Sequence, residues 1–349
     1  MLLTIYIPTF NRAKRLEKSI ADVFREIKSS NLETSISVLV GDNCSPDATF
    51  QVCAEAKEIA LIEEIDFSYF KNVRNLGFSG NISSGLERVK SDWIMFLSDD
   101  DNLYQGALAN VCQDITEKSP SIALYNFAQP PYDVTNPLIT KNIYSIQNVD
   151  YLQLTSLVIW PKLTGIVFRV QPIIGKSMQI QEICAYSKHF PHVILSAYIL
   201  SQAPGLLTSK IFLGRPDDDF LDHVNFVPYI GEYLISEFTS YIDHFDSKNE
   251  SLKQLVAQIP RTSILDVSVS SLIGYYRGHT KMTKKVKARL ESNLSRWIFG
   301  KSRTSDGLLF LKPSKYFFFK LLLVPFFALA AALRYHLSGQ KLQLMEDGF

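Results

Sequence analysis

The sequence predicts an α/β fold in which a mostly parallel central sheet is flanked by helices. Short apolar runs alternate with helical segments between residues 2 and 127, and four successive runs end at loops rich in Asn, Asp, Pro and Gly. With 349 residues, of which 46% are hydrophobic, the chain is long enough to bury a large core. Strands that alternate with helices at this spacing are joined by crossover helices, a connection typical of a parallel sheet.

Each expected element has a local signal. Strands are expected at 2–7, 36–41, 67–70, 93–97 and 122–127, and helices at about 13–29, 46–62, 80–90 and 105–118. Apolar side chains recur at helical spacing in the first helix, for which Asn11 is an expected N-cap. Ser45 followed by Pro46 predicts the start of the second helix, with Pro at its first position.

The pattern is looser beyond residue 128. A helix is expected at 148–158, a strand at 162–169, a helical region at about 180–203 and a short strand at 211–215. From about residue 228 the chain is expected to be helical and basic. These changes divide the sequence into three parts, at 1–127, 128–227 and 228–349.

The charge of the chain is unevenly distributed. Residues 260–349 carry 15 Lys or Arg and 5 Asp or Glu, whereas the other 259 residues carry 21 and 30. A basic tail on an acidic body indicates an anionic surface as its partner, either a membrane or a nucleic acid. The thirteen apolar residues at 321–333 are too few to span a bilayer, so an in-plane amphipathic or re-entrant membrane anchor beside the basic patch is expected. The alternative is a buried C-terminal helix that packs on the protein or on a second subunit.

Cysteine usage and the first residues point to a cytosolic protein. The four cysteines are scattered and form no Cys-X-X-Cys pair, which fits reduced thiols better than a disulfide framework. Residues 2–7 run directly into an expected strand, with no basic start or cleavage site, so no signal peptide is predicted.

Three adjacent carboxylates, Asp99, Asp100 and Asp101, follow the apolar run at 93–97. Adjacent carboxylates repel one another, and a hard divalent cation such as Mg²⁺ or Mn²⁺ would compensate their charge. In an open α/β sheet, ligands bind outside the carboxyl ends of the strands, where these acids are expected. The alternative is a turn whose last acid, Asp101, caps the helix that starts near Gln105.

Three further polar loops follow the first three strands. They comprise Pro8–Arg12, Asp42–Asp47 and Asn72–Asn81, and all are expected at the same edge of the sheet as the acids. The third loop leads into a helix whose N-terminus can offer free N–H groups to an anion.

Taken together, in this order and spacing, the four loops resemble those of the family 2 glycosyltransferases, which have the GT-A fold. The resemblance is specific over about 2–127 and loose over about 160–215. It implies that 1–127 is the nucleotide-sugar-binding half of one GT-A domain and that 128–227 is its acceptor-binding half. The segment 228–349 would be a helical, basic region that associates with the membrane.

The resemblance also implies roles for individual residues. Asp42 would accept a hydrogen bond from the base, with capping of its own turn as the alternative, and Ser98 stands where the family usually has the first Asp of its metal motif. Asp100 and Asp101 would bind Mg²⁺ or Mn²⁺. The full set expected to bind the nucleotide sugar is Pro8, Thr9, Asn11, Arg12, Asp42, Asn75, Gly77, Asn81, Ser98, Asp99 and Arg215.

The family's usual Glu-Asp pair, which supplies the catalytic base, has no counterpart at the expected place. His192 stands there instead and can accept a proton near neutral pH. His189 and the acids Asp217, Asp218 and Asp219 are the alternatives.

The resemblance implies a glycosyltransferase that moves a sugar from a nucleoside-diphosphate donor to a glycan, with inversion. The acceptor would be polyprenyl-diphosphate-linked, as in bacterial O-antigen or capsule assembly, and the 96–101 variant is similar to that of abequosyltransferase-like enzymes. The expected location is cytoplasmic and peripheral, with 277–337 on the anionic inner face of the plasma membrane. Nucleic acid is not an expected partner, and homo-oligomerisation through the C-terminal helices stays open. The alternative function is a non-catalytic assembly subunit with the same fold.

Overall fold

The computed structural model describes residues 1–127, 142–146, 163–170, 181–182 and 187–213. The chain divides into two compact units, 1–219 with 236–255, and 220–235 with 256–349. Every described residue lies in the first unit. The boundary predicted at residue 228, the basic C-terminal region and the helix expected at 148–158 lie outside the described residues.

The elements alternate as expected in the first 127 residues. The strands are β1 Leu3–Thr9, β2 Ile36–Asp42, β3 Asp66–Lys71, β4 Trp93–Phe96, β5 Ile122–Phe127, β6 Ile143–Ile146, β7 Ile166–Arg169 and β8 Gly205–Leu213. The helices are α1 Ala13–Ser29, α2 Thr49–Ile62, α3 Gly77–Leu86, α4 Ala107–Lys118 and α7 Pro191–Gln202.

One sheet contains all eight described strands, in the order β3-β2-β1-β4-β7-β5-β8-β6. The strands β1, β2, β3 and β4 are mutually parallel where they pair. β7 runs antiparallel to both β4 and β5, and β6 runs antiparallel to β8. The predicted α/β fold is confirmed, but the sheet is parallel only in its first half and mixed in its second.

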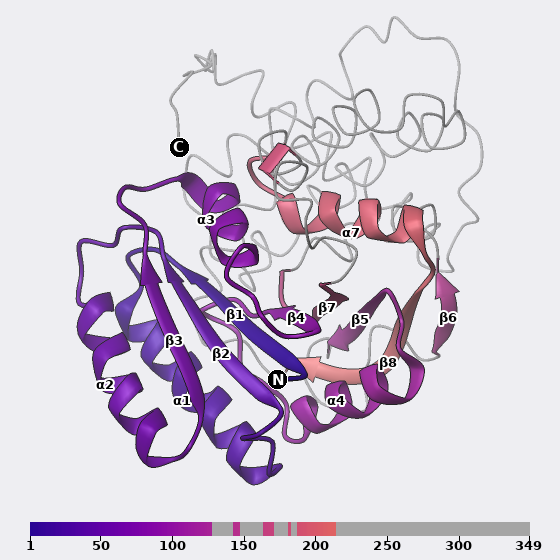
Figure 1. Ribbon diagram of the computed structural model, residues 1–349, viewed down its shortest axis with the longest axis horizontal. Helices are drawn as coiled ribbons and strands as arrows, with labels where there is room; N and C mark the ends of the chain where they lie inside the picture. The colour runs from indigo at the N-terminus through magenta and orange to yellow at the C-terminus, as the bar shows by residue number, and fades with distance from the viewer. Residues whose placement is uncertain (128–141, 147–162, 171–180, 183–186, 214–349) are drawn as a thin grey trace, which may run out of the picture. The chain divides into compact units, whose positions relative to one another are not determined.

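The two faces of the sheet carry different helices. In Figure 1, α1, α2 and α4 cover one face, and α3 and α7 lie over the other. α1 buries Leu16, Ile20, Val23 and Ile27 against the sheet, as its helical spacing predicted. The result is a three-layer arrangement with the loops after β1 to β4 at one edge.

Tyr6 of β1 fixes α3 to the sheet. Its hydroxyl donates to the carbonyl oxygen of Asn81 in α3 at 2.7 Å. The ring occupies the space that a side chain on Gly41 of β2 or Gly85 of α3 would fill. Glycine at these two positions therefore allows the close approach of helix and sheet.

Two helix starts differ from the sequence predictions. Asn11 does not cap α1, because its φ of 56° turns the chain sharply and the N–H of Ala13 instead donates to Asp47 Oδ2 at 2.9 Å. α2 begins at Thr49 rather than at Pro46. Asp47 accepts the backbone N–H of Thr49 at 3.2 Å, so one carboxylate accepts a backbone N–H at the start of both helices.

Asp101 does not cap α4, which contradicts the alternative interpretation of the acidic stretch. The helix starts after Gly106, which has a φ of 77°, and it has no side-chain cap of its own. Buried carboxylates of α1 replace that cap: Asp22 accepts the N–H of Leu103 at 2.7 Å, and Glu26 accepts the N–H of Gly106 at 3.0 Å. Two backbone N–H groups of the turn before α4 are thereby satisfied by α1.

Candidate functional site

The loops that follow β1, β2, β3 and β4 meet at the carboxyl edge of the parallel half of the sheet. The first two are joined by the N–H of Asn11, which donates to Ser45 Oγ at 2.8 Å, and by the N–H of Asn43, which donates to Thr9 O at 3.0 Å. The fourth loop is tied to the start of β7, since the N–H of Ser98 donates to Thr164 Oγ1 at 2.8 Å. The predicted convergence of the four loops is what the structure shows.

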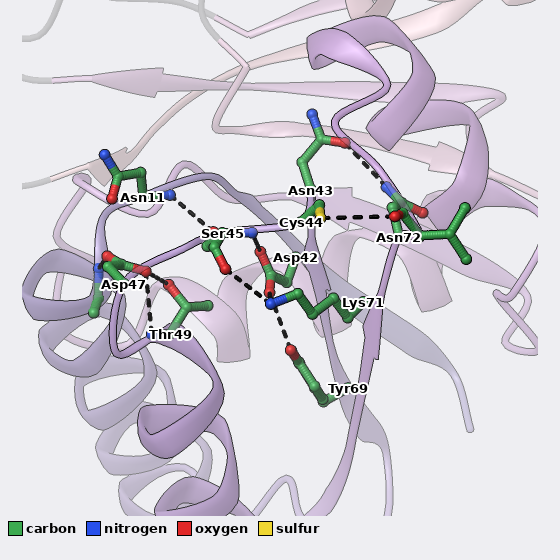
Figure 2. A network of polar contacts seen from close by, with 12 residues as sticks. Asn11, Asp42, Asn43, Cys44, Ser45, Asp47, Thr49, Tyr69, Lys71 and Asn72 are labelled. Atoms are coloured by element: carbon green, nitrogen blue, oxygen red, sulfur yellow. Dashed lines mark hydrogen bonds and ion pairs between the residues drawn. The ribbon is translucent and has the colours of Figure 1, made fainter.

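Asp42, at the end of β2, is fully buried and both of its carboxylate oxygens are engaged (Figure 2). Oδ1 accepts the N–H of Ser45 at 2.7 Å, which is the turn-capping role. Oδ2 accepts the hydroxyl of Tyr69 at 3.1 Å and lies 3.7 Å from Lys71 Nζ. Burial, followed by the charge of Asp42, raises the pKa of Tyr69, so its hydroxyl keeps its proton. Because Asp42 is 0% exposed, a nucleobase could contact it only after the side chain became accessible.

Asn43 is the hub between the second and third loops. Its Nδ2 donates to Asn75 Oδ1 at 2.7 Å and to the carbonyl of Gly77 at 3.0 Å. Its Oδ1 accepts from the N–H of Leu76 at 2.9 Å and from Asn72 Nδ2 at 3.2 Å. Four hydrogen bonds use the whole capacity of one amide, which fixes the third loop relative to β2. The sequence did not single out Asn43, although it lies in the polar loop Asp42–Asp47.

The residues predicted to shape the nucleotide wall divide into exposed and buried ones. Asn75 and Gly77 are exposed, and Gly77 has a φ of 73° with open space where a side chain would stand. Asn81 is 3% exposed, and its amide donates to the carbonyl of Gly41 at 2.8 Å. Pro8 and Thr9 are also buried. The buried residues thus position the loops, whereas Asn75 and Gly77 are accessible to a ligand.

The acidic loop is compensated by arginines from the start of α1. Arg12 Nη1 lies 2.9 Å from Asp99 Oδ1 and 3.1 Å from Asp100 Oδ2, and Arg15 Nη1 lies 3.5 Å from Asp100 Oδ2. Thr9 Oγ1 also donates to Asp99 Oδ2 at 2.7 Å. The repulsion between adjacent acids, which argued for a cation, is therefore already offset by protein charges.

Asp99 and Asp100 differ in accessibility. Asp99 is 3% exposed, and burial raises its pKa although Arg12 and Thr9 act in the opposite direction. The side chain of Asp100 is 14% exposed, and its Oδ1 accepts the hydroxyl of Ser98. Asp101 is partly exposed. Asp100 and Asp101, rather than Asp99, are the acids that a ligand can reach.

The oxygen donors of this loop fit a hard divalent cation by their chemistry, because Mg²⁺ and Mn²⁺ prefer carboxylate and hydroxyl oxygens. In the part of the chain that the structure describes, no group of three or more His, Cys, Asp or Glu is arranged around a common metal position. The Asp100 carboxylate already accepts hydrogen bonds from Ser98 and Arg12 and forms an ion pair with Arg15. A cation at Asp100 would have to replace some of these contacts.

His192 lies in the first turn of α7, between two aromatic rings. Its ring centroid is 6.0 Å from that of Phe78 in α3 and 6.1 Å from that of Phe190. The residue is 3% exposed, whereas Phe78 is 36% exposed. His189 is partly exposed. Arg215, Asp217, Asp218 and Asp219 lie outside the described residues.

The structure describes three cysteines, and all three are free thiols: Cys44, Cys53 and Cys112. Burial raises the pKa of the Cys53 thiol to about 12. Of the helices within the described ranges, none combines the length and apolar character needed to cross a membrane.

The layered sheet, with polar loops at its carboxyl edge, has an arrangement of the GT-A type. Residues 4–171 match the model of glycosyl transferase family 2. The predicted resemblance is thereby confirmed.

A curated relative from Campylobacter jejuni, GalNAc(5)-diNAcBac-PP-undecaprenol beta-1,3-glucosyltransferase, is 31% identical over 116 residues. The match covers 33% of this chain and 35% of the relative, so the chain spans about a third of that protein's length.

Two solved structures share the fold. Staphylococcus aureus TarS 1-349 in complex with UDP-GlcNAc superposes with a TM-score of 0.53 at 15% identity, covering 98% of this chain and 93% of that chain. The mannosyltransferase PcManGT from Pyrobaculum calidifontis, in complex with GDP-Man and Mn²⁺, gives 0.51 at 11% identity, covering 97% and 88%. At these identities the likeness concerns the fold alone.

Proposed function

We propose that this protein transfers a sugar from a nucleoside-diphosphate donor to a polyprenyl-diphosphate-linked glycan in bacterial surface polysaccharide synthesis. The observation that carries the proposal is the single hydrogen-bonded and ionic network that joins the four edge loops. The match of residues 4–171 to the model of glycosyl transferase family 2 supports the reaction class. The name of the Campylobacter jejuni relative, which includes a PP-undecaprenol acceptor, supports the lipid-linked substrate.

Accessible residues of the network supply the donor site in this proposal. Asn75 and Gly77 line the base and ribose, and the Arg12 guanidinium binds the diphosphate through charge-assisted hydrogen bonds. Asp100 and Asp101 would hold Mg²⁺ or Mn²⁺, which supplies positive charge to the leaving diphosphate. The complex of PcManGT with GDP-Man and Mn²⁺ supports a divalent metal in a protein of this fold.

His192 is our proposed general base for an inverting displacement. Its imidazole would take the proton of the acceptor hydroxyl as that oxygen attacks C1 of the sugar and the nucleoside diphosphate leaves with the bonding electrons. The imidazole lies beside Phe78, which is 36% exposed, so a rotation of Phe78 would open His192 to the acceptor. His192→Gln should abolish transfer and leave donor binding intact, whereas His189→Gln should retain transfer. Full activity of His192→Gln would assign the base elsewhere.

The donor is best identified by a thermal-shift screen of UDP-, GDP- and dTDP-sugars with Mn²⁺, because a ligand that binds the native state raises the midpoint. The donor with the largest shift is then tested for transfer to a synthetic polyprenyl-diphosphate glycan, with Asp92→Asn as a surface control and Asp100→Asn as the site variant. Transfer that depends on Asp100 supports the enzyme. Tight nucleotide binding without turnover on any acceptor would favour the non-catalytic assembly subunit.

Peripheral association with the inner face of the plasma membrane completes the proposal. It is supported by the nine Lys or Arg and single acid within 277–303. Co-sedimentation with phosphatidylglycerol vesicles, compared with phosphatidylcholine vesicles, tests it. Equal recovery from both would contradict a charge-driven contact.

A further inference from the structure

The loop between β3 and α3 presents apolar side chains to solvent. Every residue from Val73 to Phe78 is exposed, and three of these six are apolar: Val73, Leu76 and Phe78. The side chain of Val73, in a residue that is 96% exposed, contributes almost no packing to the core. Apolar side chains that gather on a protein surface mark an interaction site, whereas single ones need no explanation.

Hydrogen bonds at the base of this loop hold its backbone in one shape. The N–H of Asn72 donates to the carbonyl oxygen of Asp42 at 2.8 Å. Asn43 accepts the N–H of Leu76 at 2.9 Å and donates to the carbonyl oxygen of Gly77 at 3.0 Å. A partner that covers the apolar side chains therefore does not have to order the loop first, which lowers the cost of binding.

The surface around the loop is basic. Residues 71–90 carry four Lys or Arg and one acid. The four cations, all exposed, are Lys71, Arg74, Arg88 and Lys90. The charge of Lys71 is partly offset by Asp42 at 3.7 Å, whereas Arg74 directly follows Val73 in the chain. Apolar side chains beside cations match an anionic bilayer, because its interface takes up the former and its headgroups attract the latter.

A second exposed apolar patch, at the end of α2, has the opposite charge. Leu61 and Ile62 are each 82% exposed, but residues 55–64 carry four acids and one lysine. Because β2 and β3 are parallel, α2 returns to the edge of the sheet opposite the four polar loops (Figure 1). An anionic bilayer repels the acids of this patch, so it serves as an internal control for the loop.

We propose that the Val73–Phe78 loop docks on an anionic phospholipid bilayer, with Val73 and Leu76 in the interface and Arg74 at the lipid phosphates. This inference rests on the proposed function, in which a lipid-linked acceptor brings the enzyme to that surface. The contact is a second one, made by the donor-binding part of the chain and separate in sequence from the basic segment at 277–303.

The inner end of the loop gives this contact its consequence. The ring centroid of Phe78 lies 6.0 Å from that of His192, the proposed base, and Asn75 and Gly77 belong to the proposed donor site. A loop that touches both the bilayer and the site fixes the site beside the membrane surface. The glycan of a polyprenyl-diphosphate acceptor then reaches the site while its lipid stays in the bilayer, which favours productive positioning.

The first test compares Val73→Asp with Leu61→Asp in the 349-residue chain. Both variants replace an exposed apolar side chain by a carboxylate, but only the first lies in the loop. Binding is measured by co-sedimentation with vesicles of phosphatidylglycerol and phosphatidylcholine. We expect Val73→Asp to weaken binding about tenfold, because it removes an apolar contact and adds a charge of the bilayer's own sign. Leu61→Asp should change binding by less than about twofold.

The cation of the loop is tested by Arg74→Gln, with Lys57→Gln in the acidic patch of α2 as the matched control. Both residues are exposed. Arg74→Gln should weaken vesicle binding about fivefold, as for one cation at an anionic surface, and the loss should shrink at high salt. Lys57→Gln should change it by less than about twofold. Circular dichroism melting shows that each variant is folded.

Insertion itself is measured with Val73→Trp, and Leu61→Trp is its control. Phosphatidylglycerol brominated on its acyl chains quenches indole emission in the bilayer, and the wild-type signal is subtracted to remove the three native tryptophans. The added emission of Val73→Trp should be quenched and that of Leu61→Trp should not. A purely structural role of the loop would not produce this difference.

Three results would overturn the inference. Equal losses of vesicle binding in Val73→Asp and Leu61→Asp would do so, as would equal quenching in the two tryptophan variants. If sedimentation velocity without vesicles shows self-association that Val73→Asp alone abolishes, and vesicle binding is unchanged, the loop contacts a second copy of the chain instead.

The outcome is separable from that of the proposed function. Donor binding and transfer without insertion of the loop would overturn the inference alone. Insertion of the loop in a protein whose midpoint no nucleotide sugar raises would support the membrane contact and remove the proposed function.

Discussion

Asp114 in α4 and Asp100 after β4 each face two cationic side chains, yet the two clusters are built differently. Asp114 is fully buried and accepts from Lys118 Nζ at 2.5 Å, Lys210 Nζ at 2.9 Å and the Tyr125 hydroxyl at 3.3 Å. Burial, followed by the charge of Asp114, raises the pKa of Tyr125, which keeps that donor protonated. The ion pairs at Asp100 are longer, at 3.1 Å and 3.5 Å, and its side chain is partly exposed.

The difference separates a structural cluster from a binding one. The partners of Asp114 come from α4, β5 and β8, and they join the helix to the second half of the sheet. The partners of Asp100 include Arg12 and Arg15 at the start of α1 and Ser98 in its own loop, at the edge where the four polar loops meet. A buried carboxylate saturated by short hydrogen bonds stabilises the fold, whereas an accessible one with long ion pairs can exchange them for a ligand.

Asp114→Asn should give the largest effect, and the effect should be on stability. The substitution leaves two lysines without their shared partner, and we expect the free energy of unfolding to fall by about 3 kcal/mol, near the lower bound for breaking a buried pair because both lysines reach water. Urea denaturation measures the change, and Glu117→Gln on the exposed side of α4 is the control. If the free energy of unfolding falls by less than about 1 kcal/mol in Asp114→Asn, the cluster around Asp114 does not stabilise the fold more than the cluster around Asp100.

Asp100→Asn should show the reverse profile. We expect transfer to fall by about 100-fold, because one group that stabilises developing charge is lost. The free energy of unfolding should change by less than about 1 kcal/mol, as for a partly exposed ion pair. Initial rates with the identified donor and urea denaturation measure the two effects. Unchanged transfer in Asp100→Asn would remove the metal role from this residue.

Asn43→Ala extends the comparison to an uncharged hub. Removing an amide that makes four hydrogen bonds should lower the free energy of unfolding by about 2 kcal/mol and weaken nucleotide binding, because the Asn75 and Gly77 wall is no longer fixed. Calorimetric titration with the preferred nucleotide measures the second effect, and Gln51→Ala on the exposed face of α2 is the control. Weaker folding with unchanged nucleotide affinity would place the third loop outside the donor site.

Asp99 should give the smallest effect, which appears as a pH dependence. Its pKa is raised by burial, so the folded protein binds more protons than the unfolded chain between the unfolded value of about 3.9 and the raised value. The stability of the wild type relative to Asp99→Asn should therefore fall as the pH rises through that window. Thermal unfolding of both proteins across pH 3.5–8 measures the difference. If the stability of the wild type relative to Asp99→Asn rises with pH, the pKa of Asp99 is lowered in the folded protein rather than raised.

Several predictions from sequence were correct because their signals are local. Apolar spacing in α1, buried runs at β1, β2 and β4, and polar loops after them all depend on neighbours within a few residues, and the structure confirms these elements. The edge position of the loops then follows from parallel pairing alone. Helix starts were less accurate, because the acceptor for the first N–H of α1 is Asp47, which lies in another loop.

The sequence by itself thus determined the α/β class, the order of the elements in the first 127 residues and the convergence of four polar loops. Only the tertiary structure decided which groups in those loops are paired. It assigned Arg12 and Arg15 to the acids, Asn43 to the third loop, and Asp22 and Glu26 to the turn before α4. It also set β7 antiparallel to β4. The physical reason is that periodicity reports which face of an element is buried, whereas charge compensation depends on residues that meet only after the sheet has formed.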